Sequence, residues 1–339
     1  MNGFGSMLKD YLEHYKISQT EFADRLGITQ KHMNEIINGK TNLSIELIIA
    51  ISLLTDIDAN VIYYVENKRK TYNMLINKYK TEKEINKMLN SYHISEMEKR
   101  GWIKIKDKSS FTQKYLDLIE YLNVKDLDIL DNYLDKRYLF KKKDDSDIKK
   151  IYLWTRHCDQ MIKNVKVSSY DSKKLDDLFN DLKEESNRTF NSNNIINILS
   201  KYGIVLYIED ALKGSKVRGC IKVMIDKPVI YMTTYYKEKS SFYFTLYHEL
   251  IHLKKDYNML KNKIVIEDML EENIIDQLAL DIMINKKVYY EILNNYDNKD
   301  EIARKYKIPL CFLYSRLARE GKIKYNSKDY INNIEKIIL

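Results

Sequence analysis

The sequence predicts an α+β fold that is predominantly helical, and three observations lead to this prediction. The 339 residues include only 2 Pro and 9 Gly, so residues that interrupt helices are scarce. Hydrophobic residues make up 44% of the chain and charged residues 31%, which is typical of chains that fold around cores. Strand-like apolar stretches cluster between residues 204 and 233. We expect an all-α N-terminal domain, a helical middle region and a C-terminal domain in which a small antiparallel sheet packs against helices.

Changes in character along the chain predict three domains, at residues 1–70, 71–190 and 191–339. The first holds short helices with apolar residues at helical spacing, and the second is helical and rich in Lys, Asp and Tyr. In the third, strands are expected at 204–208, 222–225 and 229–233, with a turn at 226–228. Long helices are expected from Ser240 and from about Asp268, and the charged run 141–150 is interpreted as an exposed loop.

Targeting signals and cysteine usage favour a cytoplasmic protein without membrane attachment. The N-terminus lacks the apolar run and small-residue cleavage site of a signal peptide. The longest apolar run, Leu47–Leu54, is far shorter than the ~18 residues expected of a membrane span. The 3 Cys residues are widely scattered and form no CxxC pair, so a reducing compartment is expected.

Residues 18–40, SQTEFADRLGITQKHMNEIINGK, have the pattern of a helix-turn-helix. A first helix is expected at about 19–26, Gly27 permits the turn, and a second helix follows Thr29. The segment resembles the HigA-like branch of the XRE repressor family. This resemblance implies binding to operator DNA, with the second helix in the major groove. It assigns Gln30 and Asn34 to adenine and Lys31 to guanine, and it assigns Gln19 and Lys40 to phosphates.

The charge of the N-terminal domain argues against DNA binding. Residues 1–70 carry 8 Lys/Arg against 9 Asp/Glu, whereas phosphate contacts supply most of the affinity for DNA. Residues 71–170 carry 21 against 15, and this basic region would add positive charge, particularly in a homodimer. The alternatives are that the N-terminal domain serves dimerisation or partner docking, and that the basic region is a solvated helical surface.

The segment FYFTLYHELIHL contains the strongest chemical motif, HExxH. His248 and His252 are four residues apart, so on a helix both imidazoles lie on one face and can share a metal ion. Glu249 lies at the edge of that face, where it can take a proton from water as a general base. The helix is apolar nearly all round and is expected to be buried, where unpaired polar groups are costly. The alternative is a hydrogen-bonded network without metal.

A zinc site needs a third protein ligand. No histidine follows His252, and Lys255 and Asn258 stand where an HExxHxxGxxH motif needs glycine and histidine, so a carboxylate is expected. The candidates are Asp256, Glu267, Asp268, Glu271, Glu272, Asp276 and Asp281. Helix spacing favours Glu272 as ligand, with Glu271 as its rival. Asp276, one turn after Glu272, would accept the second N–H of a ligating histidine. The buried stripe of this helix is predicted to be Ile275, Leu278, Ala279 and Ile282.

The segments FTLYHELIH and EENIIDQLALDIMI, together with the hairpin IKVMIDKPVIYMTT before them, resemble the ImmA/IrrE family of metallopeptidases. The resemblance covers about residues 195–320. It implies a zincin-like domain that binds Zn²⁺ through His248, His252 and Glu272. Glu249 would be the catalytic base, and Asp276 would be the hydrogen-bond acceptor of a ligating histidine. The resemblance also implies a zinc metalloendopeptidase that hydrolyses a peptide bond.

Together the two resemblances imply a regulator that binds operator DNA and cleaves a partner repressor or antitoxin, or itself. Proteins of this kind act in mobile elements, stress responses and toxin–antitoxin loci. One alternative is a transcription regulator or antitoxin without proteolysis, whose zinc site is structural or sensory. Another is an active peptidase whose helix-turn-helix only docks the substrate. Tyr247 and Tyr231 are candidate oxyanion donors, and the strand 229–233 could pair with an extended substrate.

Overall fold

A computed structural model describes residues 3–139, 148–233, 237–262, 264–265 and 272–337; for residues 131, 135–139, 264–265 and 272 it describes the backbone alone. The chain divides into two compact units, Met1–Lys125 and Asp126–Leu339. The HExxH motif and the helix-turn-helix therefore belong to different units. The three domain ranges given by the sequence stay a prediction.

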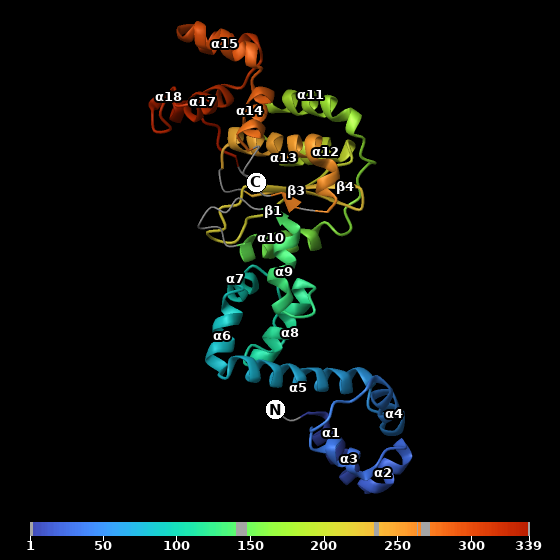
Figure 1. Ribbon diagram of the computed structural model, residues 1–339. Coiled ribbons are helices and arrows are strands. Elements are labelled where there is room, and N and C mark those ends of the chain that lie inside the picture. The colour runs from blue at the N-terminus through green and yellow to red at the C-terminus, as the bar shows by residue number, and fades with distance from the viewer. Residues whose placement is uncertain (1–2, 140–147, 234–236, 263, 266–271, 338–339) are drawn as a thin grey trace. The chain divides into compact units, whose positions relative to one another are not determined.

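The first unit begins with the helices α1 to α5 (Figure 1, blue), whose buried side chains form one small core. They are α1 (Phe4–His14), α2 (Gln19–Leu26), α3 (Gln30–Ile37), α4 (Ile45–Thr55) and α5 (Ala59–Tyr79). The core is built from fully or nearly fully buried side chains, among them Phe4, Leu8, Phe22, Met33 and Ile51.

The helices predicted on either side of Gly27 are confirmed, and side-chain caps mark where they and α4 begin. The side chains of Ser18, Thr29 and Ser44 each accept a hydrogen bond from the backbone N–H three residues on, which satisfies a donor that the first helical turn leaves open. Gly27 ends α2 in the left-handed conformation, with φ of 67°, which a residue with a side chain adopts at a cost.

The rest of the first unit is α6 (Glu82–Asn90), α7 (Ile94–Lys99) and α8 (Phe111–Leu122). Helix α8 packs against the long helix α5, where the rings of Tyr72 and Phe111 stack with centroids 5.4 Å apart. Buried Asp117 on α8 accepts hydrogen bonds from the backbone N–H of Lys106 and from the side chain of Gln113, both at 2.8 Å. The contact with Lys106 holds the segment between α7 and α8, which has no helix or strand of its own.

The second unit combines a sheet with helices on both faces (Figure 1). Its strands are β1 (Tyr138–Leu139), β2 (Val205–Ile208), β3 (Gly219–Met224), β4 (Lys227–Met232) and β5 (Ile264–Val265). Its helices are α9 (Asp128–Arg137), α10 (Ile148–Met161), α11 (Leu175–Ser186), α12 (Ser192–Lys201), α13 (Lys239–Leu260), α14 (Glu272–Met283), α15 (Lys286–Asn294), α16 (Lys299–Lys305), α17 (Leu310–Arg319) and α18 (Lys328–Asn333), with short 3₁₀ turns at Ser172–Lys174 and Tyr296–Asn298.

The expectation of an antiparallel sheet is wrong, because the sheet is mixed. Its order is β1-β5-β3-β4-β2. Strands β3 and β4 form an antiparallel hairpin, but β2 pairs parallel with β4 and β1 pairs parallel with β5. Between β2 and β3 the chain passes the position of β4, which lies between them in the sheet, and strand patterns alone do not reveal this order. The hairpin turn also lies earlier than predicted, at Ile225 and Asp226, which both have positive φ.

The two faces of the sheet are covered by different helices. On one face, α10 contributes Trp154, whose ring meets Tyr231 of β4 edge to face at 6.1 Å. On the other face, α13 buries Leu246 and Leu250 in the main core together with Ile221 and Ile230 of the hairpin. The helix carrying the HExxH motif is thus enclosed between the sheet and the C-terminal helices, as its nearly continuous apolar sequence predicts.

The charged run 141–150 falls mostly outside the described residues; its last three residues, 148–150, begin α10 and are not a loop. Among the helices of the described residues, none is long and apolar enough to cross a membrane.

Candidate metal centre and candidate nucleic-acid interface

Two buried histidines face each other on α13. His248 and His252 have exposed fractions of 9% and 3%. Their ring centroids are 4.9 Å apart, and their Nε2 atoms are separated by 3.2 Å. Two nitrogens bound at about 2.05 Å to one tetrahedral zinc ion would lie about 3.3 Å apart. The spacing of this pair therefore fits two ligands of a single zinc ion.

The other ring nitrogens of both histidines contact carboxylates. His248 Nδ1 lies 3.0 Å from Asp276 Oδ1, and His252 Nδ1 lies 3.2 Å from Asp256 Oδ2. A neutral imidazole that donates its Nδ1 proton to a carboxylate has a lone pair at Nε2. Two such lone pairs directed at each other across 3.2 Å repel, and a shared cation removes that repulsion. The donor set thus matches zinc in chemistry as well as in spacing.

Asp276 joins the histidine pair to the C-terminal helices. Its Oδ1 contacts His248, and its Oδ2 accepts a hydrogen bond from Arg319 of α17 at 2.6 Å. Burial opposes ionisation of Asp276, but the hydrogen bond with His248 and the positive charge of Arg319 outweigh it and lower the pKa of its carboxyl group. Asp276 makes the contact that its predicted role requires, and the role itself stays a prediction.

Asp256 was predicted only as a possible third ligand, yet its carboxylate orients His252 from one turn farther along α13. The helix departs from regular geometry at this residue, with φ of −116° and ψ of 18°. The four-residue spacing between His252 and Asp256 is the sequence signal that could have indicated this role.

Most candidates for the third ligand lie outside the described side chains. Among the residues described, no group of three or more His, Cys, Asp or Glu is placed to hold a metal ion. Glu267, Asp268 and Glu271 lie outside the described residues, as does the side chain of Glu272. The backbone of Glu272 begins α14, one turn before Asp276 on the same face. Asp281 is held elsewhere by Arg316, at 2.7 Å.

The buried stripe predicted for α14 is partly wrong. Ile275 and Ala279 are fully buried, but Leu278 is 40% exposed, whereas Leu280 and Met283 lie in the core. The stripe that packs in the core is therefore shifted around the helix from the predicted one, toward Leu280 and Met283.

Glu249 lies where the start of β3 approaches α13. Its exposed fraction is 5%. A Cβ atom at Gly219 would lie 3.0 Å from Glu249 Oε1 and 3.0 Å from Thr245 Cγ2, so only glycine leaves these side chains undisturbed. Sequence reasoning missed Gly219, because nothing in the sequence shows that β3 begins beside the motif.

The predicted oxyanion donors are both buried. Tyr231 donates its hydroxyl hydrogen to Asp159 of α10 at 2.5 Å, on the face of the sheet covered by that helix. Tyr247 is 1% exposed and packs against Tyr243 and Phe179 in the core. Burial raises the pKa of both hydroxyl groups. The idea that strand 229–233 pairs with substrate is wrong, because β4 is already paired with β3 on one side and β2 on the other.

In the first unit, helices α2 and α3 and the loop after α3 carry the residues assigned to DNA. These residues, Gln19, Gln30, Lys31, Asn34 and Lys40, are all exposed. Asn38 Nδ2 donates to Asn34 Oδ1 at 2.6 Å, which leaves the amide group of Asn34 and the second lone pair of its oxygen for other partners.

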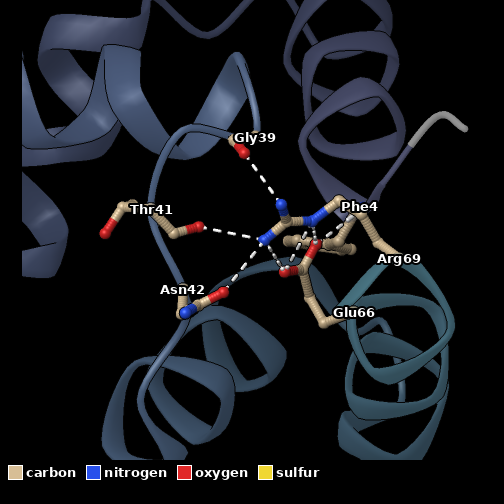
Figure 2. Close-up of polar contacts among 6 residues, drawn as sticks. All are labelled: Phe4, Gly39, Thr41, Asn42, Glu66 and Arg69. Atoms are coloured by element: carbon tan, nitrogen blue, oxygen red, sulfur yellow. Dashed lines mark hydrogen bonds and ion pairs between the residues drawn. The ribbon is translucent and has the colours of Figure 1, made fainter. Parts of the chain in front are cut away.

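A buried ion pair on α5 anchors the loop that follows α3 (Figure 2). Arg69 Nη2 lies 2.8 Å from Glu66 Oε2, and both side chains are less than a tenth exposed. The guanidinium donates to Gly39 O at 2.8 Å and Thr41 O at 3.1 Å, and Glu66 Oε1 accepts from Phe4 N at 3.0 Å. The pair therefore holds α1 and the backbone on both sides of Lys40. Sequence reasoning missed it, because its partners lie about 30 and 60 residues away.

Comparison with known proteins gives one family match. Residues 8–62 match the model of the helix-turn-helix family, described as "Helix-turn-helix" and of the XRE type. No curated protein and no solved structure matches the chain. The match confirms the helix-turn-helix domain and supports a DNA-binding regulator. The peptidase, its zinc ion, a protein substrate and a homodimer stay predictions.

Proposed function

We propose that this protein is a DNA-binding regulator whose second unit is a zinc-dependent endopeptidase of the ImmA/IrrE type. The observation that carries the proposal is the geometry of the HExxH histidines. Their Nε2 atoms lie 3.2 Å apart, while each Nδ1 contacts a carboxylate. The family match to residues 8–62 supports operator DNA as a partner and does not bear on proteolysis.

In this proposal His248, His252 and Glu272 hold the metal. Bound zinc would supply Lewis acidity and lower the pKa of water toward ~7. Glu249, buried beside Gly219, takes the proton of the attacking water at its carboxylate and delivers it to the departing amine as the peptide bond breaks. Asp276 and Asp256 hold the two imidazoles with Nε2 directed to the metal.

The substrate is proposed to be a partner repressor or antitoxin, or a second site in the chain itself. A regulatory target agrees with a DNA-binding domain in the same chain. Co-expression with the products of neighbouring genes, followed by intact-mass analysis, identifies the cleaved protein and the cleaved bond.

Glu249→Gln tests the proposal. The amide keeps the size of the side chain but cannot accept the proton, so zinc content should remain at one per chain while cleavage falls by at least about 10²-fold. Glu184→Gln, an exposed change on α11, is the matched control and should cleave normally. Undiminished cleavage by Glu249→Gln would sink the peptidase proposal and favour a regulator with a structural or sensory zinc site.

A further inference from the structure

A cavity of 520 Å³ lies in the second unit beside the HExxH helix. This volume is within the range of about 300–1,000 Å³ found for small-ligand clefts. Its apolar wall is formed by Phe244 of α13, Leu280 and Met283 of α14, and Tyr325 and Tyr330 near the C-terminal end. Ser241 and Ser315 face it from α13 and α17.

The cavity adjoins the proposed metal centre, because three residues that line it also lie against residues of that centre. The ring of Phe244 has its centroid 6.2 Å from that of His248. Thr245 approaches the same point of β3 as Glu249. Arg319, which also lines the cavity, donates to the Asp276 that contacts His248. A group bound in the cavity is therefore separated from His248 by a single side chain, that of Phe244.

The charges around the cavity are balanced. Arg319 is paired with Asp276 and lies over the ring of Phe244 at 3.8 Å. The lining also holds one further cation, Arg218, and one carboxylate, Glu238, which accepts a hydrogen bond from Tyr330 at 2.8 Å. Asp276, which does not line the cavity, neutralises Arg319, and Arg218 and Glu238 have opposite charges. Since aromatic and aliphatic side chains form much of the rest of the wall, the cavity favours a neutral apolar guest over an acidic or basic one.

We propose that this cavity is the specificity pocket of the peptidase and receives a large aliphatic or aromatic side chain of the substrate next to the scissile bond. The inference rests on the proposed function and extends it to the class of residue that is recognised. It assigns Ser241, Ser315 and Met283 to substrate selection and not to proton transfer or metal binding.

Hydroxamates test the pocket without requiring turnover, because they chelate zinc through two oxygens and can carry a chosen side chain. The full chain is loaded with one equivalent of Zn²⁺ and titrated by calorimetry with acetohydroxamate and with analogues that bear isobutyl, benzyl or carboxymethyl groups. The isobutyl and benzyl analogues should have affinities at least about tenfold higher than that of acetohydroxamate, since each buries an apolar side chain. The carboxymethyl analogue should show no such gain.

Two variants fill the pocket independently, Ser315→Trp and Ser241→Trp, so misfolding of one does not decide the result. Each should keep its zinc and its affinity for acetohydroxamate and lose the gain from the large side chain. Asn197→Trp, an exposed change on α12, is the control and should keep the gain.

The possible failures are distinguishable. If all hydroxamates bind equally, or the carboxymethyl analogue binds best, the pocket inference is overturned and the peptidase proposal stands. If the gain survives both tryptophan variants, the apolar group binds elsewhere and the inference is again overturned. If the chain takes up no zinc, or zinc-loaded chain does not bind acetohydroxamate, the proposed function fails and the pocket inference falls with it.

Discussion

At the scale of single residues, Gly219 connects the sheet to the proposed catalytic base. A methyl group there would press on Glu249 Oε1 and Thr245 Cγ2, both 3.0 Å away. We expect Gly219→Ala to displace Glu249 and reduce cleavage at least tenfold while zinc content is kept. The double variant Gly219→Ala, Thr245→Ser removes the contact with Thr245 Cγ2, keeps those with Glu249 Oε1 and with Tyr231 O at 3.2 Å, and should recover part of the activity. Normal cleavage by the single variant would mean that the strand can shift without cost.

Asp276 offers a second test at this scale, because its effect is measured in zinc affinity and not in turnover. Its carboxylate contacts His248 Nδ1, and its predicted role is to fix the orientation of that ring. Asp276→Asn weakens that contact, and we expect zinc to bind about 10–100-fold more weakly in competition with a chromophoric chelator. Asp297→Asn, an exposed change near the end of α15, should leave the affinity unchanged. Equal affinities in both variants would exclude an orienting role for Asp276.

The three cysteines give a prediction that does not depend on the proposed function. Cys158, Cys220 and Cys311 are free and buried. Burial raises the pKa of each thiol, that of Cys311 to about 12, so little thiolate exists at pH 8. We expect no rapid reaction with a disulfide reagent in the native protein and three reactive thiols per chain in guanidinium chloride. Fast labelling of a native thiol would show that its surroundings open readily.

At the scale of elements, the Glu66–Arg69 pair determines how the loop after α3 is held. Arg69→Met leaves a buried carboxylate without its cation, which costs about 3–5 kcal/mol. We expect faster hydrogen exchange in α1 and in the loop around Lys40, measured on the full chain by mass spectrometry. Glu66→Gln combined with Arg69→Met removes both charges and keeps an acceptor for Phe4 N, so it should restore most of the protection in α1 but not in the loop, whose carbonyls at Gly39 and Thr41 still lack their donors. Glu96→Gln with Arg100→Met breaks a half-exposed pair and serves as the control.

Elements with local signals could be predicted from the sequence, and those fixed by distant contacts could not. The cap residues Ser18 and Thr29 begin α2 and α3 as expected, because a cap acts within one helical turn. The parallel pairing of β2 with β4 and the rotation of α14 depend on residues far away in the chain. The same division holds in the candidate site.

In the candidate site, the HExxH spacing identified His248 and His252 because it is a property of one helix. Arg319 was missed because α17 meets α14 only in the folded chain. There Arg316 donates to the carbonyls of Leu280 and Ile284 at the end of α14, and Arg319, three residues on, reaches Asp276. The side chains of Arg316 and Arg319 on α17 thus hold both the end of α14 and the carboxylate that contacts His248.

At the scale of the whole molecule, net charge and DNA binding must be reconciled. Lys40 is exposed in the loop that Arg69 anchors. Its side chain is predicted to contact a DNA phosphate. Binding to DNA from upstream of the gene should weaken with salt, and Lys40→Ala should reduce the slope by about 1 for each bound chain. Lys9→Ala, an exposed change on α1, should leave the slope unchanged. No dependence on salt would exclude phosphate contacts and favour a docking role.

The division into two compact units makes a last prediction about zinc. The helix-turn-helix lies within Met1–Lys125 and the HExxH helix within Asp126–Leu339. A ligand that binds only the folded state stabilises the part that must be folded to bind it. Zinc should therefore slow hydrogen exchange in α13 and α14 and leave α2 and α3 unchanged, while a chelator reverses the effect. Protection in α2 and α3 as well would mean that zinc stabilises both units together, and the metal could then influence DNA binding directly. Protection in α13 and α14 alone would mean that the two units respond separately, so regulation would have to act through the cleaved protein.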